Sequence, residues 1–100
     1  IGLNEASAIK MKIGGFNPPR PLTHDLLHST IKNLEANLEK IVIDKLEENT
    51  FYAKLIIKTE KGQTKTVDAR PSDSIALAVR ANVPIFVDEE VLKQTEVFNK

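Results

Sequence analysis

The sequence lacks cysteine altogether, and its longest unbroken apolar run spans only residues 75–79. The absence of cysteine excludes disulfide-stapled folds and thiolate metal sites, and it is compatible with a reducing, cytoplasmic compartment. A membrane-spanning helix needs about 20 consecutive apolar residues, so the sequence predicts none. No signal-peptide pattern is visible either. We therefore expect a cytoplasmic protein that makes no membrane contact.

An excess of charge of either sign is also missing, since 14 basic residues balance 14 acidic ones. No global electrostatic field therefore draws in a polyanion, although a local basic patch is compatible with this balance. The five aromatic residues are scattered, so no platform for stacking nucleic-acid bases is evident. What is present, 41% apolar and 28% charged residues, is typical of a chain that folds. The length predicts a single domain over residues 1–100.

Apolar spacing and helix-ending residues predict two helices in the first third of the chain. Residues 4–13 form a short predicted helix that Gly14 and Gly15 end, and a proline-rich loop follows. Thr23 is the predicted N-cap of a longer helix. Four apolar residues of this helix repeat at helical spacing and should face the core. They are Leu27, Ile31, Leu34 and Leu38.

Three runs with the composition and alternation of strands follow. They span residues 40–46, 50–59 and 63–68. In the middle run one face carries Ala53 and Leu55 while the other carries Lys54, as a half-buried strand requires. The short turns between the runs, at residues 48–49 and 61–62, predict antiparallel pairing.

The last third predicts a helix, a short buried strand at residues 84–87 and a final helix capped by Asp88. Ser72 is the predicted N-cap of the first of these helices, and Asn82 is its predicted end. Its inward side chains are predicted to be Ile75, Ala76 and Val79. Because the element order lacks regular βαβ alternation, we expect an α+β fold, an antiparallel or mixed β-sheet packed with about four helices.

Two histidines at the start of the second helix are candidates for chemistry. His24 and His28 are four residues apart and share one side of the helix, a spacing that can present two imidazoles to one metal ion. The positive end of a helix favours a neutral imidazole, so His24 is also a candidate base. The alternatives are a polar helix edge and, for Asp25, simple stabilisation of the helix start.

A second polar group lies where a strand leads into the third helix. If it is functional, Asp68 and Asp73 could hold a divalent cation such as Mg²⁺ or Mn²⁺ while Arg70 steadies a phosphate, with Arg20 as a further phosphate ligand. The structural alternative is that Ser72 and Asp73 cap the helix while Arg70 pairs with Asp68 or Asp25. No phosphate loop, zinc-protease helix or nucleophile elbow is present.

Several motifs, in this order, resemble the bifunctional nuclease domain family. The most specific are Arg20-Pro21-Leu22-Thr23-His24-Asp25 and Asp68-Ala69-Arg70-Pro71-Ser72-Asp73, and the resemblance spans nearly the whole chain. It implies an α+β domain that hydrolyses RNA and DNA, often as a homodimer. It also implies that one or two strands precede Ile1, so we expect an N-terminally incomplete domain. The positions that match the motifs are Glu5, Arg20, Thr23, His24, Asp25, Asp68, Arg70, Ser72 and Asp73.

Two hypotheses follow. The first is a metal-assisted phosphodiesterase in which Asp68 and Asp73 bind the metal. In this hypothesis His24 is a base or a further ligand, and Arg20 and Arg70 hold the phosphate. The second is a non-enzymatic binding or regulatory module, in which the same motif residues form a structural ion-pair network. The balanced charge favours the second, and so does the absence of the carboxylate-x-Lys element common in restriction-type nucleases.

Overall fold

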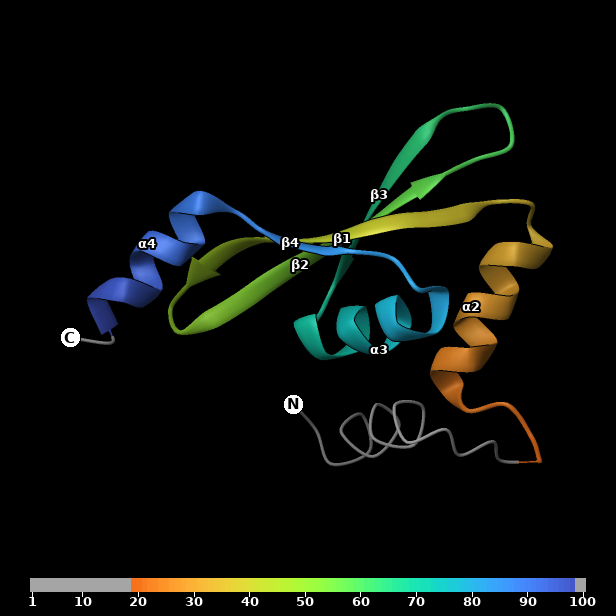
Figure 1. Ribbon diagram of the computed structural model, residues 1–100, viewed down its shortest axis with the longest axis horizontal. Coiled ribbons are helices and arrows are strands. Elements are labelled where there is room, and N and C mark those ends of the chain that lie inside the picture. Colours follow the sequence, from red (N-terminus) through yellow and green to blue (C-terminus); the bar gives the residue numbers. More distant parts are fainter. Residues whose placement is uncertain (1–18, 99–100) are drawn as a thin grey trace.

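The computed structural model describes residues 19–98, which form three helices and four strands (Figure 1). Along the chain they are α2 (Thr23–Asn33), β1 (Asn37–Glu47), β2 (Thr50–Lys58), β3 (Thr64–Ala69), α3 (Pro71–Ala81), β4 (Ile85–Val87) and α4 (Glu89–Phe98). The predicted α+β class is confirmed. The described residues hold three helices rather than about four, and the helix predicted at residues 4–13 lies outside them.

The four strands form one mixed sheet in the order β3-β2-β1-β4. β1 pairs antiparallel with β2, and β2 pairs antiparallel with β3. β4 instead pairs parallel with β1, where Ile41 faces Ile85. Since β3 and β4 therefore run the same way at opposite edges, the chain must cross the sheet between them, and α3 makes this crossing. Figure 1 shows α2 beside α3 on the same side of the sheet.

The two predicted hairpins are confirmed, and their turns have the backbone that such turns need. Glu48 and Asn49 both have positive φ angles, 49° and 62°, as in the two-residue turn whose twist matches that of paired strands. In the turn between β2 and β3, Gly62 has a φ of 82°, which glycine adopts without steric cost. These turns fix the register of β2, whose alternation then places Ala53 and Leu55 in the core.

The core lies between the sheet and α3. Ile41 and Ala53 are fully buried in the sheet, and Leu77 packs against this cluster from α3. The predicted inward face of α3 was partly wrong, because Ala76 is buried but Ile75 and Val79 are only half-buried. The buried residues of α3 are Ser72, Ser74, Ala76, Leu77 and Ala78. This broad buried surface arises because α3 contacts the sheet and α2 at once.

Both predicted N-caps next to the motifs were displaced. Leu22, not Thr23, precedes α2, and the Asp25 carboxylate accepts a hydrogen bond from the Leu22 backbone N–H at 3.0 Å. Arg70, not Ser72, precedes α3, because Pro71 occupies the first helical position, where its fixed φ and missing N–H are tolerated. Thr23 and Ser72 are therefore helical residues, and their side chains are available for contacts other than capping.

The predicted apolar stripe of the second helix was wrong at Leu27, which is 39% exposed, and at its far end. α2 ends at Asn33, and the backbone N–H groups of Glu35 and Ala36 bond back to the carbonyls of Lys32 and Ile31. This paired closure with a left-handed residue, Glu35 at a φ of 61°, is the Schellman motif. Leu34 is consequently 76% exposed, whereas Leu38 reaches the core from β1.

The C-terminal elements follow the prediction in order but not in burial. β4 forms where predicted, yet all three of its residues are exposed, and it lies at the edge of the sheet that the described strands form. Asp88 caps α4 as predicted, since its carboxylate accepts the Glu90 N–H at 2.9 Å. Asn82 ends α3 as predicted, with a φ of 55°. No helix within residues 19–98 is long and apolar enough to cross a membrane.

Candidate active site

The two polar motifs meet where the first turns of α2 and α3 pack together. His24 Nε2 lies 2.9 Å from Asp73 Oδ1, a contact between residues that are 49 positions apart. His24 is buried and Asp73 is half-buried. The crossing of α3 beneath the sheet, beside α2, thus brings into contact two side chains that local sequence spacing cannot relate.

Arg70 binds the same carboxylate. Its Nε donates to Asp73 Oδ2 at 2.8 Å, and its Nη2 donates to Oδ1 at 3.1 Å, which is the forked geometry of a strong arginine–carboxylate pair. The hydrogen bonds from Arg70, and then the one from His24, hold the pKa of Asp73 below its usual range. Asp73 is therefore an ionised carboxylate at neutral pH. We refer to Arg70, Asp73 and His24 as the polar trio.

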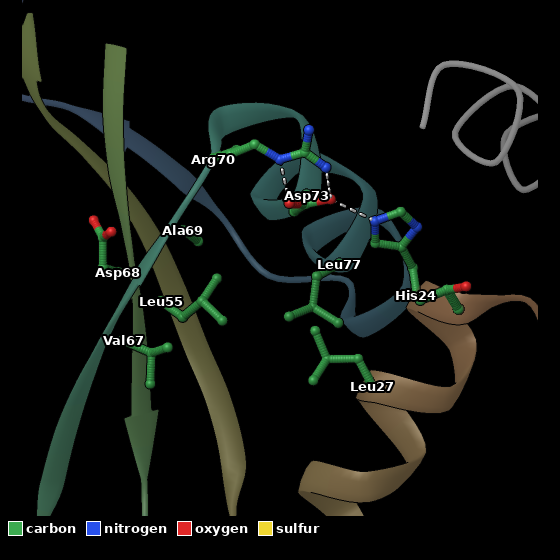
Figure 2. A pocket seen from close by; sticks show the side chains of 10 residues that line it. His24, Leu27, Leu55, Val67, Asp68, Ala69, Arg70, Asp73 and Leu77 are labelled. Atoms are coloured by element: carbon green, nitrogen blue, oxygen red, sulfur yellow. Dashed lines mark hydrogen bonds and ion pairs between the residues drawn. The ribbon is translucent and has the colours of Figure 1, made fainter. Parts of the chain in front are cut away.

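A pocket of about 440 Å³ opens beside the polar trio (Figure 2). Most of its lining is apolar, and its polar residues are the trio, Thr23 and Asp68. The apolar residues are Leu27, Leu55, Val67, Ala69 and Leu77. The volume falls in the range of about 300–1,000 Å³ that is typical of small-molecule sites. The pocket is thus an apolar hollow with a charged margin.

The hydrogen bond to Asp73 determines which nitrogen of His24 carries a proton. Because an ionised carboxylate only accepts hydrogen bonds, Nε2 must be the donor. Nδ1 is buried, and no hydrogen-bond partner for it lies among the residues that the structure describes. In Figure 2, Nε2 is the ring nitrogen that points toward Asp73. A molecule in the pocket can therefore engage Nε2 only by competing with Asp73 for its proton.

Asp25 belongs to a different pair. Its Oδ1 accepts a hydrogen bond from Arg80 Nε at 2.6 Å, and the Arg80 side chain is only 2% exposed. Asp25 is therefore directed at Arg80 in the last turn of α3, and Arg70 pairs with neither Asp25 nor Asp68 through any bond that we observe in residues 19–95. The sequence prediction did not include Arg80. The only available signal was a basic residue in the last turn of a helix, which is common for dipole reasons alone.

Asp68 faces away from the polar trio. Its carboxylate lies 3.1 Å from Lys54 Nζ, directly across the strand pair, and this hydrogen bond raises the pKa of Lys54. Figure 2 shows the Asp68 carboxylate pointing away from the apolar lining of the pocket. Since Ala69 and Val67 point to one face of β3, the intervening Asp68 must point to the other.

The described residues do not fit the predicted divalent cation. Both oxygens of Asp73 accept hydrogen bonds from Arg70, one of them also contacts His24, and Asp68 lies on the opposite face of the sheet. Within the part of the chain that the structure describes, no three His, Asp or Glu side chains gather as a metal-binding group. An Asp68–Asp73 cation site is therefore a prediction without support from this arrangement of donors.

The other predicted site residues are dispersed. Thr23 lines the pocket, whereas Ser72 is buried in α3 and is not part of the lining. Arg20 is exposed in the loop before α2, and His28 is half-buried on α2; neither lines the pocket. Glu5 lies outside the described residues. Among the described residues, the structure thus brings together Thr23, His24, Arg70 and Asp73, and Asp68 joins the pocket lining with its carboxylate turned away. Four predicted residues lie outside the lining: Arg20, Asp25, His28 and Ser72.

Comparisons with known proteins identify one family and two curated relatives that this chain resembles. A family model described as the bifunctional nuclease domain matches residues 1–100. Two curated relatives from strains of Mycobacterium tuberculosis, named uncharacterized protein MT1877 and uncharacterized protein Rv1829, are each 49% identical over 94 residues. Each match covers 94% of this chain and 55% of the relative. The chain therefore spans about half the length of the curated relatives it matches.

Proposed function

Because this chain belongs to the bifunctional nuclease domain family, we propose that it hydrolyses phosphodiester bonds of RNA, DNA or both at the pocket beside the polar trio. The family supplies the nuclease-like class of function. The observation that carries the assignment to this place is the bonded array of Arg70, Asp73 and His24 at the margin of a pocket large enough for a ligand. A base, its orienting carboxylate and a cation for the phosphate are the groups that such a reaction uses.

Each member of the trio has a distinct role in this proposal. The Arg70 side chain is 61% exposed, so its guanidinium can reach a substrate phosphate while Asp73 fixes its orientation. Asp73 positions Arg70 and His24 together because it accepts hydrogen bonds from both. It is a positioning residue rather than a group that touches the substrate.

His24 carries the proton transfer. As water attacks phosphorus and the bond from phosphorus to the leaving oxygen breaks, that oxygen gains negative charge and needs a proton. In the imidazolium form, His24 would release the Nε2 proton from its bond to Asp73 and pass it to this oxygen, which leaves a neutral imidazole. The attacking water loses its proton to the same nitrogen, and the imidazolium is restored.

The experiment is a cleavage assay of labelled single-stranded RNA and DNA, with and without a chelator. His24→Gln keeps an N–H that can bond to Asp73 but cannot transfer a proton, so cleavage should fall by a factor on the order of 10²–10⁴. His28→Gln is the matched control, because His28 is four residues along the same helix and does not line the pocket. Equal cleavage by His24→Gln and the unmodified chain refutes the assignment.

A second function class also has an observation in its favour. The same bonds that form the polar trio join α2 to α3, so the motif residues could serve a non-enzymatic binding or regulatory module as a structural network. The two functions predict different stabilities for variants of the polar trio. If His24→Gln and Asp73→Asn unfold far more easily than the unmodified chain, the motif is structural. Variants that fold normally and cannot cleave nucleic acid support the enzyme.

The proposal extends to assembly and location. We propose a homodimer, because β4 and α4 expose apolar side chains at one edge of the sheet, among them Ile85, Phe86 and Leu92. Light scattering across a dilution series measures the mass directly, and a monomer at all concentrations contradicts this proposal. The cytoplasm is the proposed location, since a chain without cysteine suits a reducing compartment.

A further inference from the structure

We infer that the pocket receives one unstacked nucleobase, adjacent to the phosphate that Arg70 contacts. This inference rests on the proposed function and names the part of the substrate that the pocket recognises. Binding of a phosphate alone does not explain the composition of the pocket. A phosphate needs only the charged margin, yet most of the lining of the 440 Å³ hollow is apolar.

Part of the apolar lining is accessible. Leu27 is 39% exposed and Val67 is 43% exposed, whereas Leu55 and Leu77, which also line the pocket, are buried behind them in the core. Contact between water and an apolar surface is unfavourable, so the hydrophobic effect favours a ligand that covers this surface. The flat face of a nucleobase is the largely apolar part of a nucleotide and meets this requirement.

The charged margin fits the rest of a nucleotide. Arg70 lies on the margin with its side chain exposed, and a phosphate attached to the base through a sugar would carry the opposite charge. Thr23 and His24 add polar groups on the α2 side of the same opening. An apolar hollow beside an arginine thus matches base and phosphate in the order that they have within one nucleotide.

A pocket for a nucleobase favours single-stranded substrates. A base that is stacked and paired within a duplex is not free to enter a pocket, and extruding it costs a few kcal/mol. Single strands, loops and ends therefore bind and react in preference to an intact duplex. The chain has few aromatic residues for stacking, so this apolar hollow is the feature of the described residues that would recognise a base.

The test compares two ligands that differ only in the base, adenosine 5′-monophosphate and ribose 5-phosphate. They are titrated into the ¹⁵N-labelled full chain while amide resonances of the pocket residues are followed by NMR. We expect the nucleotide to shift the amides of Ala69 and Thr23 and to bind at least about tenfold more tightly than ribose 5-phosphate. Equal affinity for the two ligands, no binding of either, or shifts confined to other residues overturns the inference.

Variants that fill the pocket provide the second measurement. Val67→Phe and Leu27→Phe each add volume at a partly exposed lining position, where the added atoms need not disturb the buried core. Both should weaken nucleotide binding by about tenfold and leave ribose 5-phosphate binding unchanged. Leu34→Phe is the matched control, because Leu34 is exposed just after the end of the helix that carries Leu27 and lies outside the lining. Unchanged nucleotide binding by both filling variants contradicts the inference.

The failure of this inference differs from the failure of the proposed function. If the base contributes to binding but no nucleic acid is cleaved by the unmodified chain, the pocket binds nucleotides and the enzymatic proposal is wrong. If cleavage depends on His24 while the base contributes nothing and Val67→Phe cleaves normally, the enzyme stands and the base pocket is wrong.

Discussion

The Asp25 carboxylate and the Arg80 guanidinium, 55 positions apart in the sequence, meet at 2.6 Å between the start of α2 and the end of α3. His24, the neighbour of Asp25, meets Asp73 at the start of α3. Two adjacent residues of one motif therefore bind opposite ends of the same helix. This double contact fixes how α2 lies against α3, and with it the position of His24 at the pocket.

Removing Asp25 should destabilise the fold by more than the loss of its hydrogen bond to Leu22 at the start of α2 explains. Arg80 has a side chain that is 2% exposed, so Asp25→Ala leaves a buried cation without this carboxylate and should cost about 3 kcal/mol of unfolding free energy. Urea denaturation measures the loss. Asp68→Ala is the control, since the Asp68 side chain is 74% exposed and ion pairs at such positions contribute little to stability. Similar losses for the two variants contradict this account.

The pair also predicts a non-additive double variant. Arg80→Met replaces the buried cation by an apolar side chain of similar length, so combining it with Asp25→Ala removes the uncompensated charge. The double variant should be more stable than Asp25→Ala alone, because it no longer buries the Arg80 cation that has lost the Asp25 carboxylate. A double-mutant cycle with denaturant midpoints measures the coupling, and purely additive losses would indicate that the two side chains act independently.

Asp73 should make the fold sensitive to acid. Its folded-state pKa lies below the usual range because of the Arg70 and His24 hydrogen bonds, so the folded state binds the carboxylate's proton less readily than the unfolded state. The resulting stability is fully present above the unfolded pKa of about 3.9 and is lost as pH falls through the lower folded value. Asp73→Asn should therefore show a weaker decline of unfolding free energy below about pH 4. Denaturation curves at a series of pH values measure the difference, and parallel profiles contradict it.

Glu35 should be replaceable by glycine with a gain in stability. It holds a φ of 61° in the Schellman motif after α2, a left-handed conformation that costs a residue with a Cβ about 1–2 kcal/mol. Glycine avoids this cost but loses more backbone entropy on folding, so Glu35→Gly should gain about 0.5–1 kcal/mol. Ser29→Gly, inside α2, should instead lose about 0.5 kcal/mol. Thermal unfolding of both variants measures whether their effects have opposite signs.

The strands were predictable because their signals are local. Alternation in β2 and the short turns at Glu48-Asn49 and Gly62 specify two hairpins without reference to the rest of the chain. The parallel pairing of β4 with β1 was not predictable in the same way. It depends on the route of α3 across the sheet, and no residue of Ile85–Val87 carries information about its partner.

The residues of the site were more predictable from the sequence than the contacts between them. Motif resemblance pointed to His24, Arg70 and Asp73, which do lie together. Asp68 was grouped with them because it is near in sequence, but strand alternation turns its carboxylate to the opposite face. Arg80 was overlooked because the contact that matters joins two helices whose packing only the three-dimensional fold determines.

The error at Leu34 leads to a quantitative test of where the core lies. Helical spacing assigns Leu34 to the apolar stripe, yet the Schellman motif ends α2 first and leaves this side chain 76% exposed. Ile41, in contrast, is fully buried between Leu55 and Ile85 in the sheet. Ile41→Ala should therefore cost about 2–5 kcal/mol, through lost burial and the cavity it leaves, while Leu34→Ala should change stability by less than about 0.5 kcal/mol. Both free energies come from urea denaturation of the purified chain. If Leu34→Ala costs as much as Ile41→Ala, Leu34 is buried in solution and α2 continues beyond Asn33, as its apolar spacing alone would suggest.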